Sequence, residues 1–229
     1  MIRLHLTLAI TLCGALCHPL PAWCQDKYLL KIVQQAPPME INESIRALLD
    51  GHAYQILDGN GNVRCEIWFR KVVPVQATPE QVQNGLTYQE IPQTTLLGAV
   101  RYAQVGRDYR GQKIKPGVYT LRFALQPQDG DHMGTAPNPE FCLLVAADKD
   151  VGPELLDVKK LHELSASSMG GNHPGVLLLM CDSKPQAQPH LAEKQDEHWV
   201  LEIQLKADAH GKGAVLGIGL TVVGKSSAA

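Results

Sequence analysis

The sequence has few aromatic residues, little net charge and no apolar run long enough to cross a bilayer. Only 5% of its 229 residues are aromatic, and 21 basic residues are balanced by 23 acidic ones for a net charge of −2. This balance gives no electrostatic basis for binding nucleic acid or an anionic membrane, and the scarcity of rings argues against a carbohydrate-binding face. The hydrophobic fraction of 45% is too high for a disordered chain. We therefore expect a folded domain with no nucleic-acid partner and no transmembrane segment in the mature chain.

Familiar catalytic motifs are also missing. The chain has no Gly-x-Ser-x-Gly elbow, no His-Glu-x-x-His helix, no phosphate-binding loop and no dinucleotide fingerprint. His162-Glu163 begins like a zinc-protease motif, but the second histidine is lacking. These absences favour a protein that is not an enzyme, although they do not exclude one.

The first 24 residues have the pattern of a secretory signal peptide. Arg3 is their only charged residue, and an apolar run over 4–17 follows it. This run is shorter than the roughly 20 residues that a membrane-spanning helix needs, and a proline-containing segment with a small residue before the cleavage position comes after it. We expect cleavage before Gln25, with cleavage after Cys17 as the second choice. The mature protein, which begins after the signal peptide 1–24, is then exported and is periplasmic or extracellular.

Removal of the signal peptide changes the charge and the cysteine count. The mature chain has a net charge of −3 and keeps three of the six cysteines, Cys65, Cys142 and Cys181. An odd number permits at most one intramolecular disulfide, for which Cys142–Cys181 is the candidate in an exported protein. The alternative is three buried thiols in apolar strands. A lipoprotein is disfavoured because neither Cys17 nor Cys24 follows a small residue.

Hydrophobic periodicity predicts an all-β protein. Residues 118–126 and 198–206 alternate between apolar and polar side chains, which is typical of half-buried strands. Residues 140–147 and 175–181 are continuously apolar, which is typical of strands covered on both faces. Further strands are expected over 28–33, 54–57, 63–70, 95–102 and 214–223.

Two short helices complete the prediction. Asn42 is a suitable N-cap for a helix over 43–49, and Pro153 suits the first position of a second helix. About eight strands separated by many turn residues then predict an antiparallel β-sandwich with two short peripheral helices. We expect one domain over 25–224 and a flexible tail over 225–229.

Several segments are similar to a group of uncharacterised exported bacterial β-sandwich proteins. The shared pattern comprises GQKIKPGVYTLR at 111–122 and QPQDGDH at 126–132, with further similarity at 65–71 and 172–174. The resemblance extends from about residue 40 to residue 180. It implies export and a single domain, and it implies no activity, cofactor or catalytic residue.

Two glycine-containing loops carry the residues best suited to metal binding. Asp129, Asp131 and His132 follow one predicted strand, and His173 precedes another. If the two loops meet at one end of the sandwich, these side chains form a divalent-metal site, and neighbouring methionines admit copper as well as zinc. The alternative is that the aspartates form turns and the histidines lie on the surface.

Trp68 offers a second type of site. By alternation it shares a strand face with Arg64, Glu66 and Arg70. An aromatic ring among charged neighbours can stack on a sugar or another ligand. The alternative is that a helix covers this face and the arginine stems pack around the ring.

Together these patterns favour an exported, non-enzymatic binding or interaction module of the bacterial envelope. Its recognition surface is expected in the loops around His132 and His173, and its partner is an envelope protein or a small ligand. The first alternative is a metal-binding protein or metal-dependent enzyme that uses these two histidines with copper or zinc. The second is a carbohydrate-binding module that uses Trp68.

Overall fold

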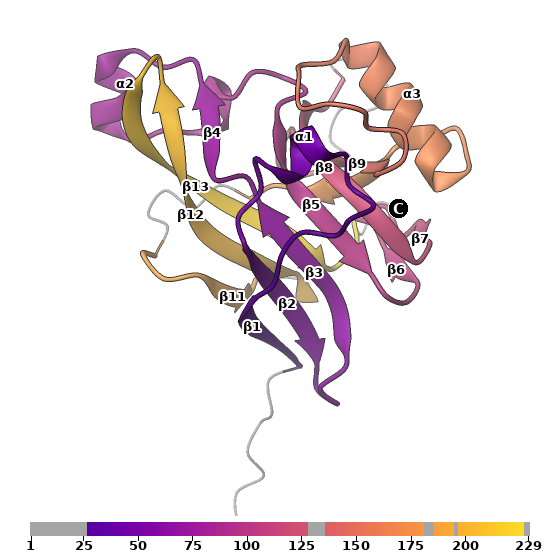
Figure 1. Ribbon diagram of the computed structural model, residues 1–229. Helices are drawn as coiled ribbons and strands as arrows, with labels where there is room; N and C mark the ends of the chain where they lie inside the picture. Colours follow the sequence, from indigo (N-terminus) through magenta and orange to yellow (C-terminus); the bar gives the residue numbers. More distant parts are fainter. Residues whose placement is uncertain (1–26, 128–135, 181–185, 195–196, 227–229) are drawn as a thin grey trace, which may run out of the picture.

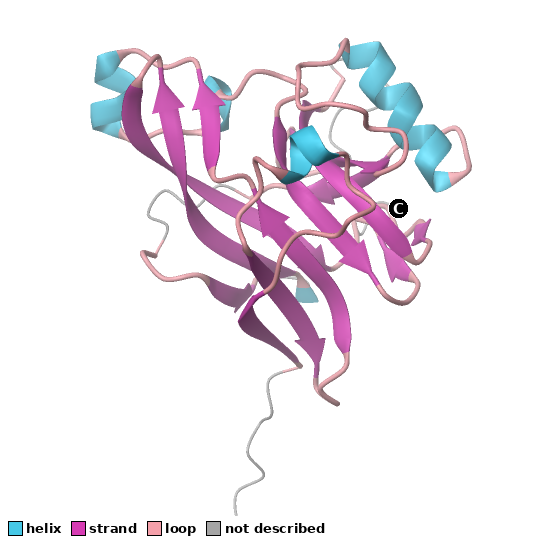
Figure 2. Ribbon diagram, viewed as in Figure 1, coloured by secondary structure: helices cyan, strands magenta, loops and turns pink. Residues whose placement is uncertain are grey.

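Strands dominate the computed structural model, which describes residues 27–127, 136–180, 186–194 and 197–226 (Figure 1). Two sheets of mainly antiparallel strands pack together, and short helices lie around them (Figure 2). The predicted fold class, an all-β sandwich with a few short helices, is therefore confirmed.

The larger sheet has seven strands and is antiparallel throughout. Its strand order is β1-β2-β3-β5-β8-β9-β10. The bounds are Tyr28–Gln34 for β1, His52–Asp58 for β2, Val63–Phe69 for β3, Leu96–Tyr102 for β5, Gly117–Leu125 for β8, Glu140–Ala146 for β9 and Gly175–Leu178 for β10. All seven were predicted as strands, with bounds that differ by a few residues.

The smaller sheet is built around a long hairpin. This hairpin consists of β12 (Trp199–Ala209) and β13 (Lys212–Val223), which pair along their whole length. The other edge of β12 pairs first with β11 (His190–Glu193) and then, in parallel, with β4 (Val72–Val75). The sequence predicted neither β11 nor β4. A separate two-stranded ribbon consists of β6 (Gly106–Arg107) and β7 (Lys113–Ile114).

The three helices are α1 (Glu43–Arg46), α2 (Pro79–Asn84) and α3 (Val158–Met169), and a 3₁₀ turn spans Tyr88–Glu90. Asn42 caps α1 as predicted. The prediction for α3 was wrong at its start, because Asp157 is the N-cap and Pro153 lies in the preceding loop. The sequence analysis missed α2, although its N-cap Thr78 forms a capping box with Gln81.

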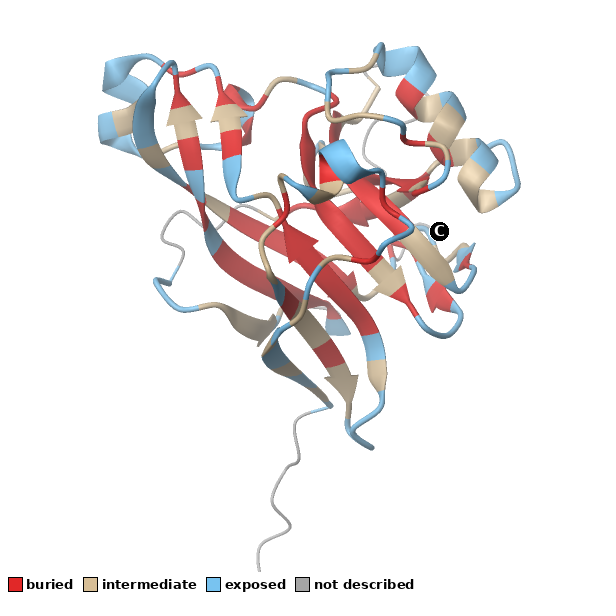
Figure 3. Ribbon diagram, in the orientation of Figure 1, coloured by how far each residue is buried: buried red, intermediate tan, exposed pale blue. Residues whose placement is uncertain are grey.

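The main core lies between the two sheets, and the buried positions follow the strands (Figure 3). The alternation in the last hairpin places its apolar residues inward as predicted. These residues are Trp199, Leu201, Ile203 and Leu205 on β12 and Leu216, Ile218, Leu220 and Val222 on β13. The larger sheet contributes Tyr119, Leu121 and Phe123 from β8, also as predicted.

The two sheets join along one edge, where β10 approaches β13. The Met180 N–H donates to the Gly219 carbonyl at 2.7 Å. The buried Tyr88 hydroxyl spans the same junction, because it donates to the Met180 carbonyl at 3.0 Å and accepts from the Gly219 N–H at 2.9 Å. A Cβ on Gly219 would lie 2.3 Å from the Met180 carbonyl oxygen, so this approach requires glycine.

The opposite edge is joined by side chains instead, because the Tyr28 and Trp199 rings pack edge-to-face with their centroids 5.4 Å apart. There β1 ends the larger sheet and β11 lies at the edge of the smaller one. Ile32 alternates with Tyr28 and Leu30, which pack against the main core, so Ile32 is on the inward face. It is nevertheless 45% exposed. The interior of the sandwich is therefore open to solvent between β1 and β11.

The outer face of β8 is more deeply buried than the sequence predicted. Alternation predicted a half-buried strand with Thr120 and Arg122 on its polar face, but both residues are fully buried. The connection from β9 to α3 covers this face, and Asp150 within it accepts from the Thr120 hydroxyl at 2.5 Å. The sequence could not show this cover, because the covering segment lies about 30 residues further along the chain.

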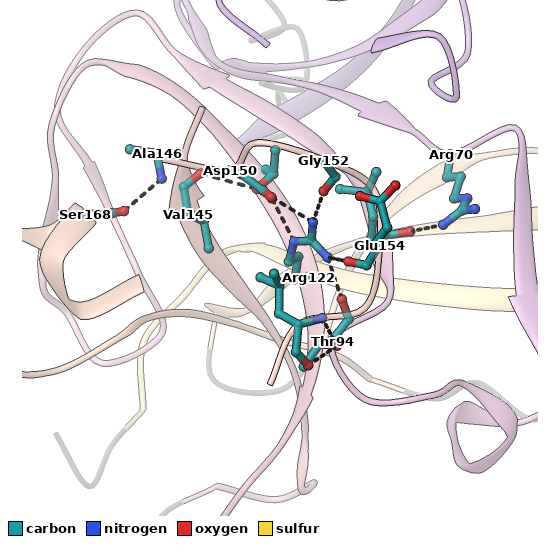
Figure 4. Close-up of polar contacts among 12 residues, drawn as sticks. Arg70, Thr94, Arg122, Val145, Ala146, Asp150, Gly152, Glu154 and Ser168 are labelled. Atoms are coloured by element: carbon teal, nitrogen blue, oxygen red, sulfur yellow. Dashed lines mark hydrogen bonds and ion pairs between the residues drawn. The ribbon is translucent and has the colours of Figure 1, made fainter. Parts of the chain in front are cut away.

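The Arg122 guanidinium is the centre of the covered face (Figure 4). Its Nε and Nη2 donate to the two carboxylate oxygens of Asp150, each at 2.7 Å. Its Nη1 donates to the carbonyls of Thr94 and Glu154, each at 2.9 Å, and Nη2 also donates to the Gly152 carbonyl. The charge is thus neutralised and its donors are satisfied, which fixes the β9–α3 connection on the sheet.

Replacing Gly219 with alanine should destabilise the protein. The new Cβ meets the Met180 carbonyl oxygen, and relieving that clash separates the sheets at their junction. We expect the free energy of unfolding in urea to fall by about 2–3 kcal/mol. Gly213→Ala is the matched control on the same strand, because nothing lies within 4 Å of a Cβ there. Equal effects of the two substitutions would contradict the steric account.

Replacing Arg122 with methionine should remove the anchor of the β9–α3 connection. The Asp150 carboxylate, with 1% of its side chain exposed, is then buried without its cation, and we expect a loss of about 3–5 kcal/mol in urea unfolding. Lys27→Met is the control, because the Lys27–Glu197 pair is exposed and contributes at most about 1 kcal/mol. A loss below about 1 kcal/mol for Arg122→Met would contradict this role.

Candidate functional site

Asp108 joins the turn over 108–112 to the start of β10, next to the loop that carries His173. It is fully buried, and its carboxylate accepts from the backbone N–H groups of Arg110, Gln112 and Val176 and from the Gln112 side-chain amide. The same amide also donates to the Pro174 carbonyl. Burial raises the pKa of Asp108, and these four hydrogen bonds oppose the rise. Asp108 therefore organises the loops structurally.

His173 lies on the surface of this loop pair. Its Nδ1 is 3.5 Å from Nη1 of Arg110. A guanidinium at this distance repels a bound metal cation. Among the described residues, no group of three or more histidine, cysteine, aspartate or glutamate side chains is arranged to hold a metal ion.

The predicted metal site also required its two loops to lie at the same end of the sheet. Asp129, Asp131 and His132 lie outside the described residues. The structure does describe the end of β8 before them and the start of β9 after them. Leu125 pairs with Glu140 at one end of β9. Gly175, two residues after His173, pairs with Leu144 toward the other end. Because Asp129, Asp131 and His132 are not described, a site shared by His132 and His173 stays a prediction.

Of the two interpretations of Trp68, the structure shows the covered face and not the exposed ring. Trp68 is fully buried, and its Nε1–H donates to the Gln35 carbonyl at 2.9 Å. Ile41 and Ile45, from the segment around α1, pack in the same cluster. Arg101 lies over the ring with its Cζ 5.7 Å from the centroid, and it pairs with Glu66. The ring is therefore part of a second core on the outer face and cannot stack on a sugar.

Two of the three mature cysteines are buried free thiols. Burial raises the pKa of Cys65 to about 12, and it also raises the pKa of Cys142. Both thiols therefore stay protonated near neutral pH and are poor nucleophiles and poor metal ligands. Because Cys142 is a free thiol in the structure, the candidate Cys142–Cys181 disulfide is not formed, and the alternative of buried thiols holds for Cys65 and Cys142; Cys181 lies outside the described residues.

The open edge of the sandwich forms a groove of about 460 Å³. Its lining residues come from the two edge strands and the segments next to them: Tyr28, Leu29, Leu30, Ile32, Pro189, His190, Leu191, Glu193 and Trp199. Leu29 and Ile32 are 43% and 45% exposed. A volume of this size falls within the range of roughly 300–1,000 Å³ that is typical of small-molecule sites.

Trp199 brings an unsatisfied polar atom to this groove. The side chain lies on the inward face of β12 and is 5% exposed. Its ring packs edge-to-face on Tyr28, with centroids 5.4 Å apart. Its Nε1 is buried without a hydrogen-bond partner. Leaving a buried donor unpaired costs about 1–3 kcal/mol, so this atom marks a place where an acceptor would bind favourably.

A small charged cluster lies on the opposite face of β11 and β12 from Trp199. The buried Glu202 carboxylate lies 2.8 Å from His190 Nε2 and 2.6 Å from Lys194 Nζ. Because His190 Nε2 faces a carboxylate, this nitrogen carries a proton. The remaining ring nitrogen, Nδ1, is buried and has no hydrogen-bond partner.

Comparison of the chain with protein-family models, with curated proteins and with solved structures finds no match. No helix within the described ranges is long and apolar enough to span a membrane. The geometry of the groove is therefore the main basis for a functional conclusion. The sequence analysis missed this site, because β11 lies in a segment predicted as a loop and the inward alternation of Trp199 predicted an ordinary core residue.

Proposed function

We propose that the mature chain is an exported, non-enzymatic binding module that holds a small ligand in the groove between β1 and β11. The observation that carries this proposal is a groove of about 460 Å³ between the two edge strands, lined by apolar side chains together with His190 and Glu193, and by Trp199, whose Nε1 is buried without a partner. Apolar linings with a few polar groups are typical of ligand sites. The proposal moves the recognition surface from the loops around His132 and His173 to this groove.

The rigidity of the surrounding structure supports a binding role. The Tyr88–Gly219–Met180 junction holds the two sheets together on the far side of the core. The groove walls are edge strands of these sheets, so their spacing is largely fixed before a ligand arrives. A preorganised site loses less conformational entropy on binding than a mobile loop does.

Export is the second part of the proposal and rests on the N-terminal pattern. A chain of 229 residues produced in a Gram-negative bacterium should appear in the periplasm or the medium with Gln25 as its first residue, as measured by intact mass. Leu12→Arg interrupts the apolar run and should keep the chain uncleaved in the cytoplasm. Cytoplasmic retention of the unaltered chain would contradict export.

Ligand binding can be tested by native mass spectrometry of the protein purified from its own host. The unaltered protein should carry a non-covalent small-molecule adduct. Ile32→Glu places a charge in the groove and should abolish the adduct. Val215→Glu is the matched control, because Val215 is exposed on β13 and does not line the groove. Absence of an adduct from the unaltered protein, or its persistence in Ile32→Glu, would contradict the proposed function.

A further inference from the structure

We infer that the two-stranded ribbon of β6 and β7 is a docking surface for a lipid bilayer that carries anionic headgroups. The ribbon lies at the periphery of the molecule, close to the C-terminal residues (Figure 1), and the Ser226 N–H donates to the Tyr109 carbonyl in its turn. This surface is separate from the groove between β1 and β11, so the inference does not depend on the proposed ligand.

The solvent-facing side of the ribbon is basic. Gly106 and Ile114 pair with each other and are both buried. Arg107 pairs with Lys113, and both are exposed. Lys115 follows the same alternation as Lys113 and is exposed as well. Like charges directly opposite each other on paired strands are destabilising, so this arrangement contributes nothing to the stability of the fold.

Further cations lie beside this face. Arg110 is in the turn of the ribbon, with Nη1 3.5 Å from His173 Nδ1. Lys225 is also close, because its Cδ would lie 3.9 Å from a Cβ on Gly111. The acidic residue of the turn, Asp108, is fully buried and occupied by hydrogen bonds.

These cations have no carboxylate partners within the described part of the chain. Neither of the two arginines, Arg107 and Arg110, nor any of the three lysines of the cluster forms an ion pair there. The sum of the charges gave no reason to expect an anionic partner, but charges act over only about 8 Å at physiological ionic strength. A surface in contact with the ribbon is therefore exposed to the local positive potential and not to the net charge of the protein.

Val105 favours a bilayer over other anionic partners. It precedes Gly106, so alternation places it on the same face as Arg107, and it is 53% exposed. Proteins that bind membrane surfaces combine apolar side chains, which enter the boundary of the acyl chains, with basic side chains, which contact anionic headgroups. A hydrophilic polyanion would gain nothing from the valine.

The test is sedimentation of the mature chain, residues 25–229, with lipid vesicles. This chain contains every described residue and lacks the apolar run over 4–17, which would itself enter a bilayer. We expect it to sediment with vesicles of phosphatidylglycerol and phosphatidylcholine in equal parts, and not with vesicles of phosphatidylcholine alone. Equal sedimentation with both kinds of vesicle, or with neither, would overturn the inference.

Charge variants locate the binding. Lys113→Gln combined with Lys115→Gln should lower the partition coefficient about 25-fold, because each cation at an anionic surface contributes about a fivefold factor. Lys31→Gln combined with Lys212→Gln is the matched control, since it removes the same charge at exposed positions on β1 and at the start of β13. The control should change the coefficient less than about twofold. Equal losses in the two double variants would overturn the role of the ribbon.

A third pair of variants tests the lipid contact itself. Val105→Ser should weaken vesicle binding about fivefold, because it removes apolar area that the bilayer would bury. Val215→Ser is the control, since Val215 is 55% exposed on β13 outside the ribbon, and it should leave binding unchanged. If the lysine variant loses binding but Val105→Ser does not, the ribbon recognises charge alone, as an acidic protein would require, and the assignment to a bilayer is overturned.

Discussion

The junction at Gly219 sets the shape of the whole sandwich. There the Tyr88 hydroxyl bonds to both sheets, and the missing side chain of Gly219 lets the β13 backbone approach Met180. At the opposite edge no strand pairing joins the sheets, and β1 and β11 meet only through side chains such as the edge-to-face pair of Tyr28 and Trp199. Inward-facing Ile32 is 45% exposed at this edge, and the groove lies beside it.

Buried polar groups play two different roles in this protein. Arg122 and Asp108 each make at least four hydrogen bonds, and each fixes a connection that covers or flanks a sheet. Trp199 Nε1 and His190 Nδ1 are also buried, but they have no partners. Satisfied groups of the first kind stabilise the fold, whereas unsatisfied groups in a groove lower its stability until something binds them. Arg70 Nε and Thr221 Oγ1 are also buried without partners and lie outside the groove, so the lining and volume of the groove, and not unpaired atoms alone, distinguish it from the structural centres.

The sequence predicted the parts of the fold that local pattern determines. Alternation identified β8, β12 and β13 and their inward faces, and the cap at Asn42 identified α1. Burial of Arg122 was not predictable, because the segment that covers it is distant in sequence, whereas burial of Trp68 under a helix was one of the two interpretations that the alternation allowed. The capping box at Thr78 was a usable signal for α2 that the analysis missed. The groove combines residues 28–32 with 189–199, and no local pattern relates these two segments.

The central claim is that the unpaired indole of Trp199 is the contact point for a ligand in the open edge. Its most direct test is the ¹⁵N–¹H spectrum of the mature protein, which contains two indole N–H groups, those of Trp68 and Trp199. The spectrum of the protein as purified from its own host is compared with that of the same protein after unfolding, removal of small molecules and refolding. Removal of the adduct should shift the Trp199 indole signal as its hydrogen bond is lost, whereas the Trp68 signal should stay in place, because its bond to Gln35 does not depend on a ligand. A stationary Trp199 signal, or equal shifts of both signals, would contradict the claim.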